Sequence, residues 1–117
     1  MVQNTGRTGE EYTAQWLREQ GFSIIAQNYH SRYGEIDIIA EDGEYIVFTE
    51  VKVRRRGSMV SPLEAVTAQK QKKILLTAQA YLVKSQYALQ PRFDVAAITL
   101  LPDGQLELQY YPTAFGW

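Results

Sequence analysis

The chain has 117 residues, 45% of them hydrophobic and 21% charged, which suits one globular domain with a single modest core. Its net charge of -1 argues against a protein that is basic all over, and the absence of an apolar run of about 18 residues argues against a membrane span. Because the chain has no cysteine, it has no disulfide or thiolate metal site, and we expect a cytoplasmic protein without a secretory signal.

The first half of the chain predicts a helix followed by three strands. The helix spans residues 8–20, because Thr8 and Glu11 match a capping box and Gly21 stands where a C-terminal cap belongs. Asp42-Gly43 predicts a two-residue hairpin turn between the second and third strands. Alternating and β-branched segments predict the strands themselves at residues 22–27, 35–41 and 45–54.

The second half predicts one more helix and two more strands. Ser61 is the expected N-cap before Pro62, and the helix runs to about residue 84. Strands are predicted at residues 93–100 and 106–110. The aromatic tail from about residue 110 is either an exposed surface suited to a dimer interface or docked on the domain. The order α-β-β-β-α-β-β predicts a single α/β domain, residues 1–117, with a mixed sheet.

Charged side chains stand on the two otherwise apolar strands that the Asp42-Gly43 turn joins. In the register of a two-residue turn, Glu35 lies opposite Glu50, and Asp37 lies diagonal to Glu50 on the same face, at roughly 7 Å. Lys52, two residues beyond Glu50, shares that face. Uncompensated charge in an apolar setting is costly, and a bound divalent metal is its simplest explanation. The alternative is a solvated strand face held by salt bridges.

The two predicted helices each bring a charged residue toward this face. The apolar stripe of the first helix, through Ala14 and Leu17, leads back to Glu10. The stripe of the second helix includes Lys70, and Lys73 lies at a neighbouring angle one turn on. Either lysine faces the site or extends its ammonium to water.

Acidic and basic residues are segregated along the chain. Residues 1–51 hold nine acidic and three basic residues, whereas residues 52–73 hold seven basic residues and one acid. A metal site beside a polyanion-binding surface would produce this pattern, as would a solvated charged face. His30 is the only histidine and is expected in a loop, and Asp94 is expected to pair with Arg92. The candidate nucleic-acid-binding residues are Arg32, Arg54, Arg55, Arg56, Lys70 and Lys73.

The spacing of Asp37 and Glu50-Val51-Lys52 resembles the signature of the PD-(D/E)xK nuclease superfamily, with Ile36 in place of the proline before the aspartate. A longer set of segments in the same order resembles the bacterial UPF0102 family, which is similar to archaeal Holliday-junction resolvases. Those segments are Gly6-Arg7-Thr8-Gly9-Glu10, Asn28-Tyr29, Gly34-Glu35-Ile36-Asp37, Phe48-Thr49-Glu50-Val51-Lys52-Val53-Arg54 and Arg92-Phe93-Asp94.

The resemblance implies a restriction-endonuclease-like core, in which a central mixed sheet is flanked by helices. It implies that Asp37, Glu50 and the Val51 carbonyl hold Mg²⁺ or Mn²⁺, and that Glu10 matches a helix glutamate near the metal. Lys52 would orient or deprotonate the attacking water, and with Glu50 beside it we expect electrostatic positioning. Glu35, which is expected opposite Glu50, either supports the metal indirectly or adds electrostatic repulsion to the site.

The expected function is that of a metal-dependent endonuclease that hydrolyses phosphodiester bonds of DNA, branched or flapped DNA included. Junction resolution needs two symmetric incisions, so that substrate predicts a two-fold homodimer. Two alternatives remain at this point. One is a nucleic-acid-binding module that has the fold without catalysis, and the other is an accessory protein whose acidic face is structural.

Overall fold

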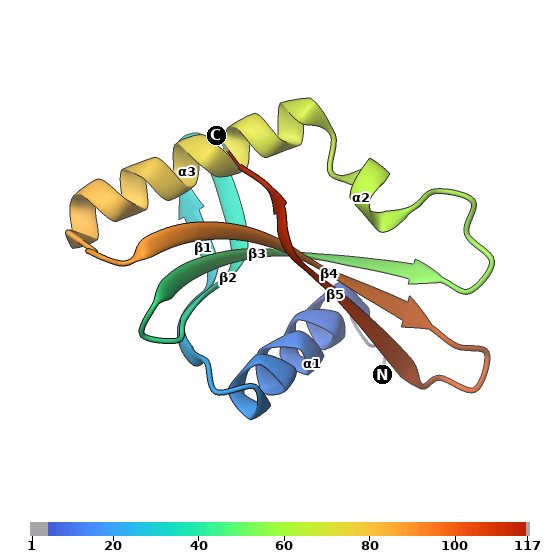
Figure 1. Ribbon diagram of the computed structural model, residues 1–117. Coiled ribbons are helices and arrows are strands. Elements are labelled where there is room, and N and C mark those ends of the chain that lie inside the picture. Colours follow the sequence, from blue (N-terminus) through green and yellow to red (C-terminus); the bar gives the residue numbers. More distant parts are fainter. Residues whose placement is uncertain (1–4, 117) are drawn as a thin grey trace.

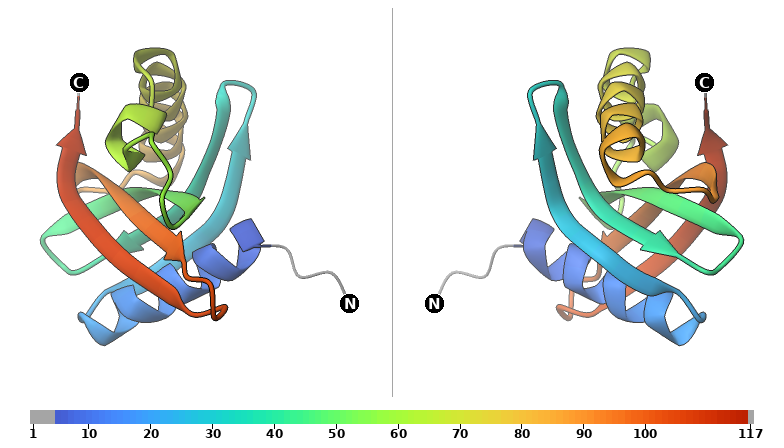
Figure 2. Two further views of the ribbon diagram at one scale, coloured as in Figure 1. Left: turned by 90° about the vertical axis from the view of Figure 1, so that its right-hand side faces the viewer. Right: turned by 90° about the vertical axis from the view of Figure 1, so that its left-hand side faces the viewer.

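The computed structural model describes residues 5–116 as two layers of helix on either side of one sheet (Figure 1). Helix α1 covers one face, and α2 and α3 lie over the other. Figure 2 shows how strongly the sheet twists, so that the β1–β2 hairpin rises beside α3. The elements are α1 (Thr5–Glu19), β1 (Ser23–Ser31), β2 (Gly34–Glu41), β3 (Tyr45–Arg55), α2 (Pro62–Ala65), α3 (Ala68–Ser85), β4 (Gln90–Leu100) and β5 (Leu106–Phe115).

The five strands lie in chain order, β1-β2-β3-β4-β5. Only β3 and β4 are parallel, because the segment with α2 and α3 connects them as a crossover. A buried cluster under α3 includes Phe48, Ile74 and Phe93, and a second cluster under α1 is built from Ala14, Leu17, Ile38 and Ala40. The predicted α/β class, mixed sheet and element order are confirmed.

The predicted second helix is wrong in one respect, because it is broken in two. Ser61 caps α2 and Thr67 caps α3, and the side chain of each accepts a backbone N–H three residues on, from Glu64 at 3.1 Å and Lys70 at 3.2 Å. The second cap starts a new helix in which Lys70 lies in the first turn.

Other boundaries also differ from the prediction. Helix α1 begins at Thr5, so Thr8 lies inside it, although Gly21 ends it as predicted with φ of +97°. Strand β1 continues to Ser31, so His30 belongs to a strand. Strand β5 continues to Phe115, whose ring stacks on Phe93 at 5.5 Å, so the aromatic tail is docked.

The hairpin between β2 and β3 has a three-residue loop, which moves the register by two residues. Asp42 Oδ1 accepts the backbone N–H groups of Glu44 and Tyr45 at 2.9 and 2.8 Å, and this bonding closes the wider turn. Glu41 therefore pairs with Ile46 instead of Glu44. The predicted proximity of Asp37 and Glu50 survives this error, because the Asp37 carboxylate still lies beside Glu50 and accepts the Val51 N–H.

Strand β2 departs from simple alternation at Asp37. Ile36 and Ile39 pack in the cluster under α3, whereas Ile38 and Ala40 pack under α1. The hydrogen-bonded pairing of β2 with β3 ends at the pair of Ile38 and Thr49. Asp37 thus stands where the two strands separate, and its carboxylate is open to groups from both layers.

None of the helices among residues 5–116 has the length and apolar character to cross a membrane.

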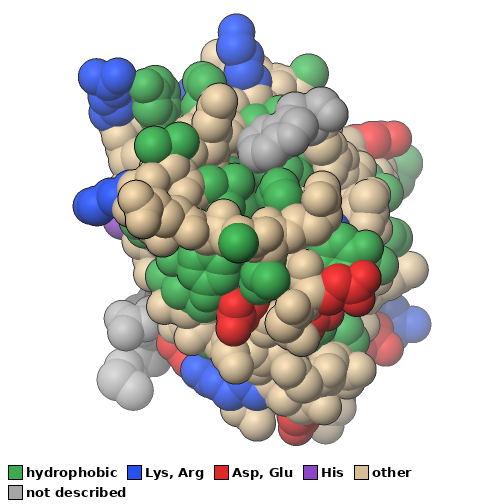
Figure 3. All heavy atoms as spheres, turned by 60° about the vertical axis from the view of Figure 1, so that its left-hand side comes forward, with side chains coloured by type: hydrophobic (Ala, Val, Ile, Leu, Met, Phe, Trp, Pro, Cys, Tyr) green, Lys and Arg blue, Asp and Glu red, His purple; other side chains and the backbone are tan. Residues whose placement is uncertain are grey.

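One face of the molecule shows hydrophobic side chains near its middle, with the drawn Lys and Arg side chains standing apart at its margins (Figure 3). That face has no continuous basic surface among the residues that are coloured by type.

Candidate active site

Three elements bring the predicted site residues together. Asp37 lies on β2, Glu50 and Lys52 lie on β3, and Glu10 comes from α1. Asp37 Oδ2 accepts the backbone N–H of Val51 at 2.7 Å. This hydrogen bond takes the place of strand pairing where β2 and β3 separate. It ties the first acidic residue directly to the Glu50-Val51-Lys52 segment.

Gly9 lets α1 approach the sheet closely enough to deliver Glu10. A Cβ at this position would lie 2.6 Å from Cγ2 of Val53 on β3. Such a distance is well inside van der Waals contact, so any larger residue would displace the helix or Val53. In the sequence, Gly9 stands out only as part of the Gly6-Arg7-Thr8-Gly9-Glu10 segment. A glycine inside a helical pattern, one residue before a candidate ligand, is the feature of the sequence that could have predicted this close approach of helix and sheet.

Glu50 is the most buried of the acidic residues of this site, with 7% of its surface exposed. Its Oε1 lies 3.5 Å from Lys70 Nζ and 3.9 Å from Lys52 Nζ. Burial, and then the neighbouring Asp37 carboxylate, raise the pKa of Glu50 to about 8. The two lysines act in the opposite direction and do not cancel this effect, so the carboxylate is short of positive charge.

Glu10, which comes from α1 on the other side of the sheet, also lacks a compensating positive charge. Its Oε1 is buried and has no hydrogen-bond partner among the described residues. Burial, followed by Asp37, raises the pKa of Glu10 to about 7. A native structure rarely leaves such an oxygen unpartnered, and an ion or water that belongs to the site is the usual explanation.

Lys52 and Lys70 approach the carboxylates from different elements. Burial, and then the adjacent Lys70 ammonium, lower the pKa of Lys52. Lys70 was predicted to lie on the apolar stripe, with its ammonium either facing the site or extending to water. It lies on the stripe and contacts Glu50, because the break at Val66 and Thr67 places it in the first turn of α3.

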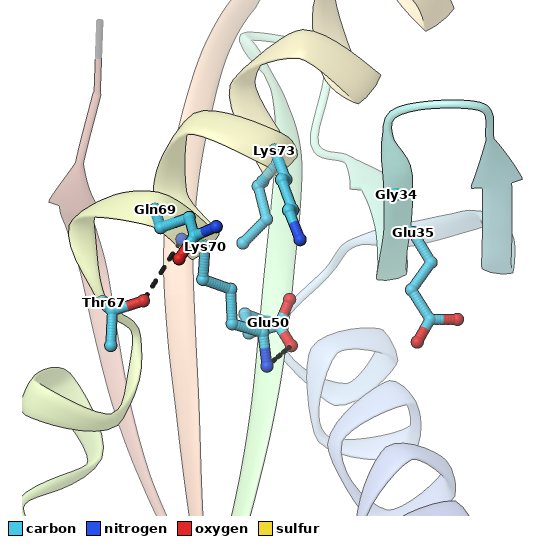
Figure 4. Close-up of a pocket in the computed structure, with 8 residues that line it drawn as sticks. Gly34, Glu35, Glu50, Thr67, Gln69, Lys70 and Lys73 are labelled. Atoms are coloured by element: carbon cyan, nitrogen blue, oxygen red, sulfur yellow. Dashed lines mark hydrogen bonds and ion pairs between the residues drawn. The ribbon is translucent and has the colours of Figure 1, made fainter.

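A pocket of about 320 Å³ opens beside Glu50, between α3 and the start of β2. In Figure 4, Lys70 and Lys73 extend from α3 into this pocket, and Glu35 lies across it on β2. A cavity with acidic residues at its base and lysines on one wall suits a phosphate beside a cation. Its lining consists of Gly34, Glu35, Glu50, Thr67, Gln69, Lys70, Lys73 and Ile74.

The residues present fit a divalent metal, although they are not arranged as a finished cage. Among residues 5–116, no three His, Cys, Asp or Glu side chains form a ready metal-binding group. The carboxylates meet in pairs instead, and Asp37 belongs to both, beside Glu10 and beside Glu50. Two carboxylates with a backbone carbonyl and waters are a normal Mg²⁺ environment. The orphaned Glu10 oxygen and the raised pKa values indicate the missing positive charge.

One sequence prediction about the site does not hold in the structure. Glu35 does not lie opposite Glu50: its carboxylate is at the rim of the pocket, 3.4 Å from His30, and the Glu35 side chain is 57% exposed. The candidate basic residues come from several elements, namely the β1–β2 turn, β3 and α3. Arg32 donates to the hydroxyl of its neighbour Tyr33 at 2.8 Å, and Arg54 donates to the Val60 carbonyl at 3.1 Å. Arg55 and Arg56 are exposed at the end of β3.

The predicted ion pair of Asp94 with Arg92 is confirmed, on the α1 side of the sheet. Asp94 is fully buried and accepts N–H groups from Arg92 at 2.8 to 3.2 Å. The hydroxyl of Tyr110 and the backbone N–H of Thr113 complete its shell at 2.7 and 2.9 Å. Because every oxygen of this carboxylate is satisfied, the group has a structural role.

The model of an uncharacterised protein family, UPF0102, matches residues 9–98, which contain all of the acidic residues of the site. The chain belongs to the UPF0102 family. A UPF0102 protein of Syntrophus aciditrophicus is 47% identical over 89% of this chain and 84% of its own length. One from Symbiobacterium thermophilum is 42% identical over 98% of both chains, and one from Dictyoglomus turgidum is 39% identical over 94% and 95%. The resemblance to UPF0102 proteins is therefore confirmed.

Proposed function

We propose that this UPF0102 protein is a metal-dependent endonuclease that hydrolyses phosphodiester bonds of DNA, with branched or flapped DNA as the substrate. The supporting observation is the charge deficit of the site. Asp37 stands where β2 and β3 separate, the Glu10 and Glu50 carboxylates each lie beside it, and burial raises the pKa of both glutamates. Carboxylates held close together in this way lower the stability of the fold, and a bound divalent cation would offset their repulsion.

The chain's own residues divide the work of hydrolysis. Asp37 and Glu50 would hold Mg²⁺ or Mn²⁺, with the Val51 carbonyl and Glu10 completing the set. When bound, the metal supplies Lewis-acid polarisation of the phosphate and lowers the pKa of water. Lys52, of which 22% of the side chain is exposed, lies beside Glu50 and would orient the attacking water and offset charge on the phosphate. The Val51 N–H fixes Asp37 in place.

The depressed pKa of Lys52 bears on its role in the reaction. From the sequence, Glu50 beside this lysine favoured electrostatic positioning over proton abstraction. Burial and Lys70 lower the pKa of Lys52, which makes the neutral amine more accessible than in an exposed lysine. Positioning remains the proposed role, because Glu50 retains its contact with the ammonium at 3.9 Å.

The decisive experiment is a cleavage assay on linear, flapped and four-way DNA, with and without Mg²⁺ or Mn²⁺. Wild type is compared with Asp37→Asn, Glu50→Gln and Lys52→Gln. We expect metal-dependent cutting and a loss of at least about a hundredfold in each variant. Glu44→Gln is the matched control, because it removes an exposed acid from the same hairpin.

Each result has a clear reading. Cutting without metal, or equal activity in wild type and Asp37→Asn, would contradict the mechanism. DNA binding without cleavage of any substrate would favour the non-catalytic binding module. A preference for four-way DNA would require a two-fold dimer, which light scattering of the purified protein tests. DNA as the substrate would also place the protein in the cytoplasm.

A further inference from the structure

Two lysines share one oxygen of Glu50. Lys70 Nζ lies 3.5 Å from Glu50 Oε1, and Lys52 Nζ lies 3.9 Å from the same atom. Two ammonium groups on one carboxylate oxygen repel each other, so the arrangement is favourable only while the carboxylates lack a stronger cation. A divalent ion between Asp37 and Glu50 would make one of the two lysines redundant.

The two lysines differ in their freedom to leave. Lys52 is anchored on β3, where it pairs with Ala97 of β4, and 22% of its side chain is exposed. Lys70 is in the first turn of α3, and 41% of its side chain is exposed. Figure 4 shows that Lys70 reaches Glu50 from the wall of the pocket, so a rotation of its side chain alone would carry the ammonium into open space.

We propose that Lys70 is a displaceable cation, which contacts Glu50 in the metal-free protein and turns into the pocket to bind a DNA phosphate once a divalent metal enters. This inference rests on the proposed function. It adds a residue that exchanges its partner, and it assigns the pocket of about 320 Å³ to a phosphate of the bound strand.

The lining of the pocket supports a phosphate as the second partner of Lys70. Lys73 extends into the same space from the next turn of α3. Two lysines on one wall, with Thr67 and Gln69 beside them, offer charge and hydrogen-bond donors to a phosphate. Without the metal the same wall faces Glu50, and an incoming phosphate would meet an acidic residue at the base of the pocket. Metal and DNA binding are therefore coupled through Lys70.

The first test measures metal binding alone. Titration calorimetry with Mg²⁺ or Mn²⁺, without DNA, compares wild type with Lys70→Met. Because the metal no longer competes with the Lys70 ammonium for Glu50, the metal affinity of Lys70→Met should be roughly three- to tenfold higher than that of wild type. Lys73→Met is the matched control, since Lys73 lines the same pocket and has no ion pair with Glu50 among the described contacts. It should leave metal affinity unchanged within about twofold.

The second test measures DNA binding with Ca²⁺ in place of Mg²⁺, so that the substrate is not cut. Lys70→Met should weaken binding and reduce the slope of log affinity against log salt by about one phosphate contact. Lys84→Met, at the far end of α3, is the control and should leave the slope unchanged.

The outcomes separate this inference from the proposed function. Equal metal affinity in wild type and Lys70→Met, with metal-dependent cleavage intact, overturns the exchange and leaves the endonuclease in place. Higher metal affinity together with an unchanged salt slope overturns the phosphate role. No metal binding by either protein overturns both proposals. Raised metal affinity with a reduced salt slope supports the exchange of partners.

Discussion

Two buried acidic clusters occupy the same sheet and have opposite electrostatics. Asp94 is surrounded by donors from Arg92, Tyr110 and Thr113, so its two oxygens are fully satisfied. Glu50 is almost as buried, yet it faces the Asp37 carboxylate. Burial and Asp37 raise the pKa of Glu50 to about 8, and the two neighbouring lysines do not cancel this effect. One cluster is complete in the folded chain. The other carries excess negative charge in the folded chain, which the proposed divalent cation would offset.

The difference separates a structural charge from a functional one. A satisfied carboxylate stabilises the fold and has nothing left to bind. A carboxylate with excess negative charge around it destabilises the metal-free fold and is kept for what it binds. Proteins commonly lose some stability at their active sites in this way. The two clusters should therefore respond in opposite directions to substitution.

The largest effect is expected at the satisfied cluster. Asp94→Ala leaves Arg92, of whose side chain 17% is exposed, without its partner. We expect the free energy of unfolding to fall by about 3–5 kcal/mol, as measured by urea denaturation. Arg55→Ala, which removes an exposed guanidinium, should change it by less than about 0.5 kcal/mol. A loss below about 1 kcal/mol for Asp94→Ala would show that this network is not structural.

The pH dependence of stability tests the unsatisfied cluster. Since folding raises the pKa of Glu50 from 4.5 to about 8, the native state holds a proton that the unfolded state releases within that range. The stabilising contribution is complete below the unfolded pKa and is lost as pH rises toward the folded pKa. Metal-free protein should lose about 1 kcal/mol per pH unit between about pH 5 and pH 8. Denaturation of Glu50→Gln should show a clearly shallower slope, and identical slopes would contradict the raised pKa.

Removal of one acid from the unsatisfied cluster should stabilise the metal-free protein. Asp37→Asn removes repulsion toward Glu10 and Glu50, and the amide oxygen can still accept the Val51 N–H. The expected gain is about 1 kcal/mol, measured without metal by thermal or urea unfolding. Saturating Mg²⁺ should reverse the order, because only wild type then gains from binding. Destabilisation of metal-free Asp37→Asn would place Asp37 with the structural residues.

The smallest effect concerns the packing that delivers Glu10. Gly9→Ala places a Cβ 2.6 Å from Val53 Cγ2, and we expect a net loss of about 1 kcal/mol after the better helix propensity of alanine is counted. Val53→Ala in the same chain removes the obstructing methyl group and should recover most of that loss in a double-mutant cycle. Additive losses would mean that α1 and β3 are not in tight contact at this point.

Much of the fold follows from local patterns. Gly21 and Ser61 act as the helix signals that they resemble, and the alternation of residues 35–41 and 45–54 predicts the two strands that hold the site. The proximity of Asp37 and Glu50 survived a register error of two residues, although β2 departs from simple alternation at Asp37. Motif spacing and helix periodicity likewise singled out Glu10, Asp37, Glu50 and Lys52.

The sequence by itself therefore determined which elements form and which acidic residues share a face, because caps, turns and periodicity depend on neighbours in the chain. Only the tertiary structure decided how these elements meet. It placed Glu35 away from Glu50, brought Lys70 within 3.5 Å of Glu50 and left one Glu10 oxygen without a partner. The physical reason is that turn length, helix breaks and the approach of α1 through Gly9 set distances between elements. Burial and charge balance, and thus the need for a cation, depend on those distances.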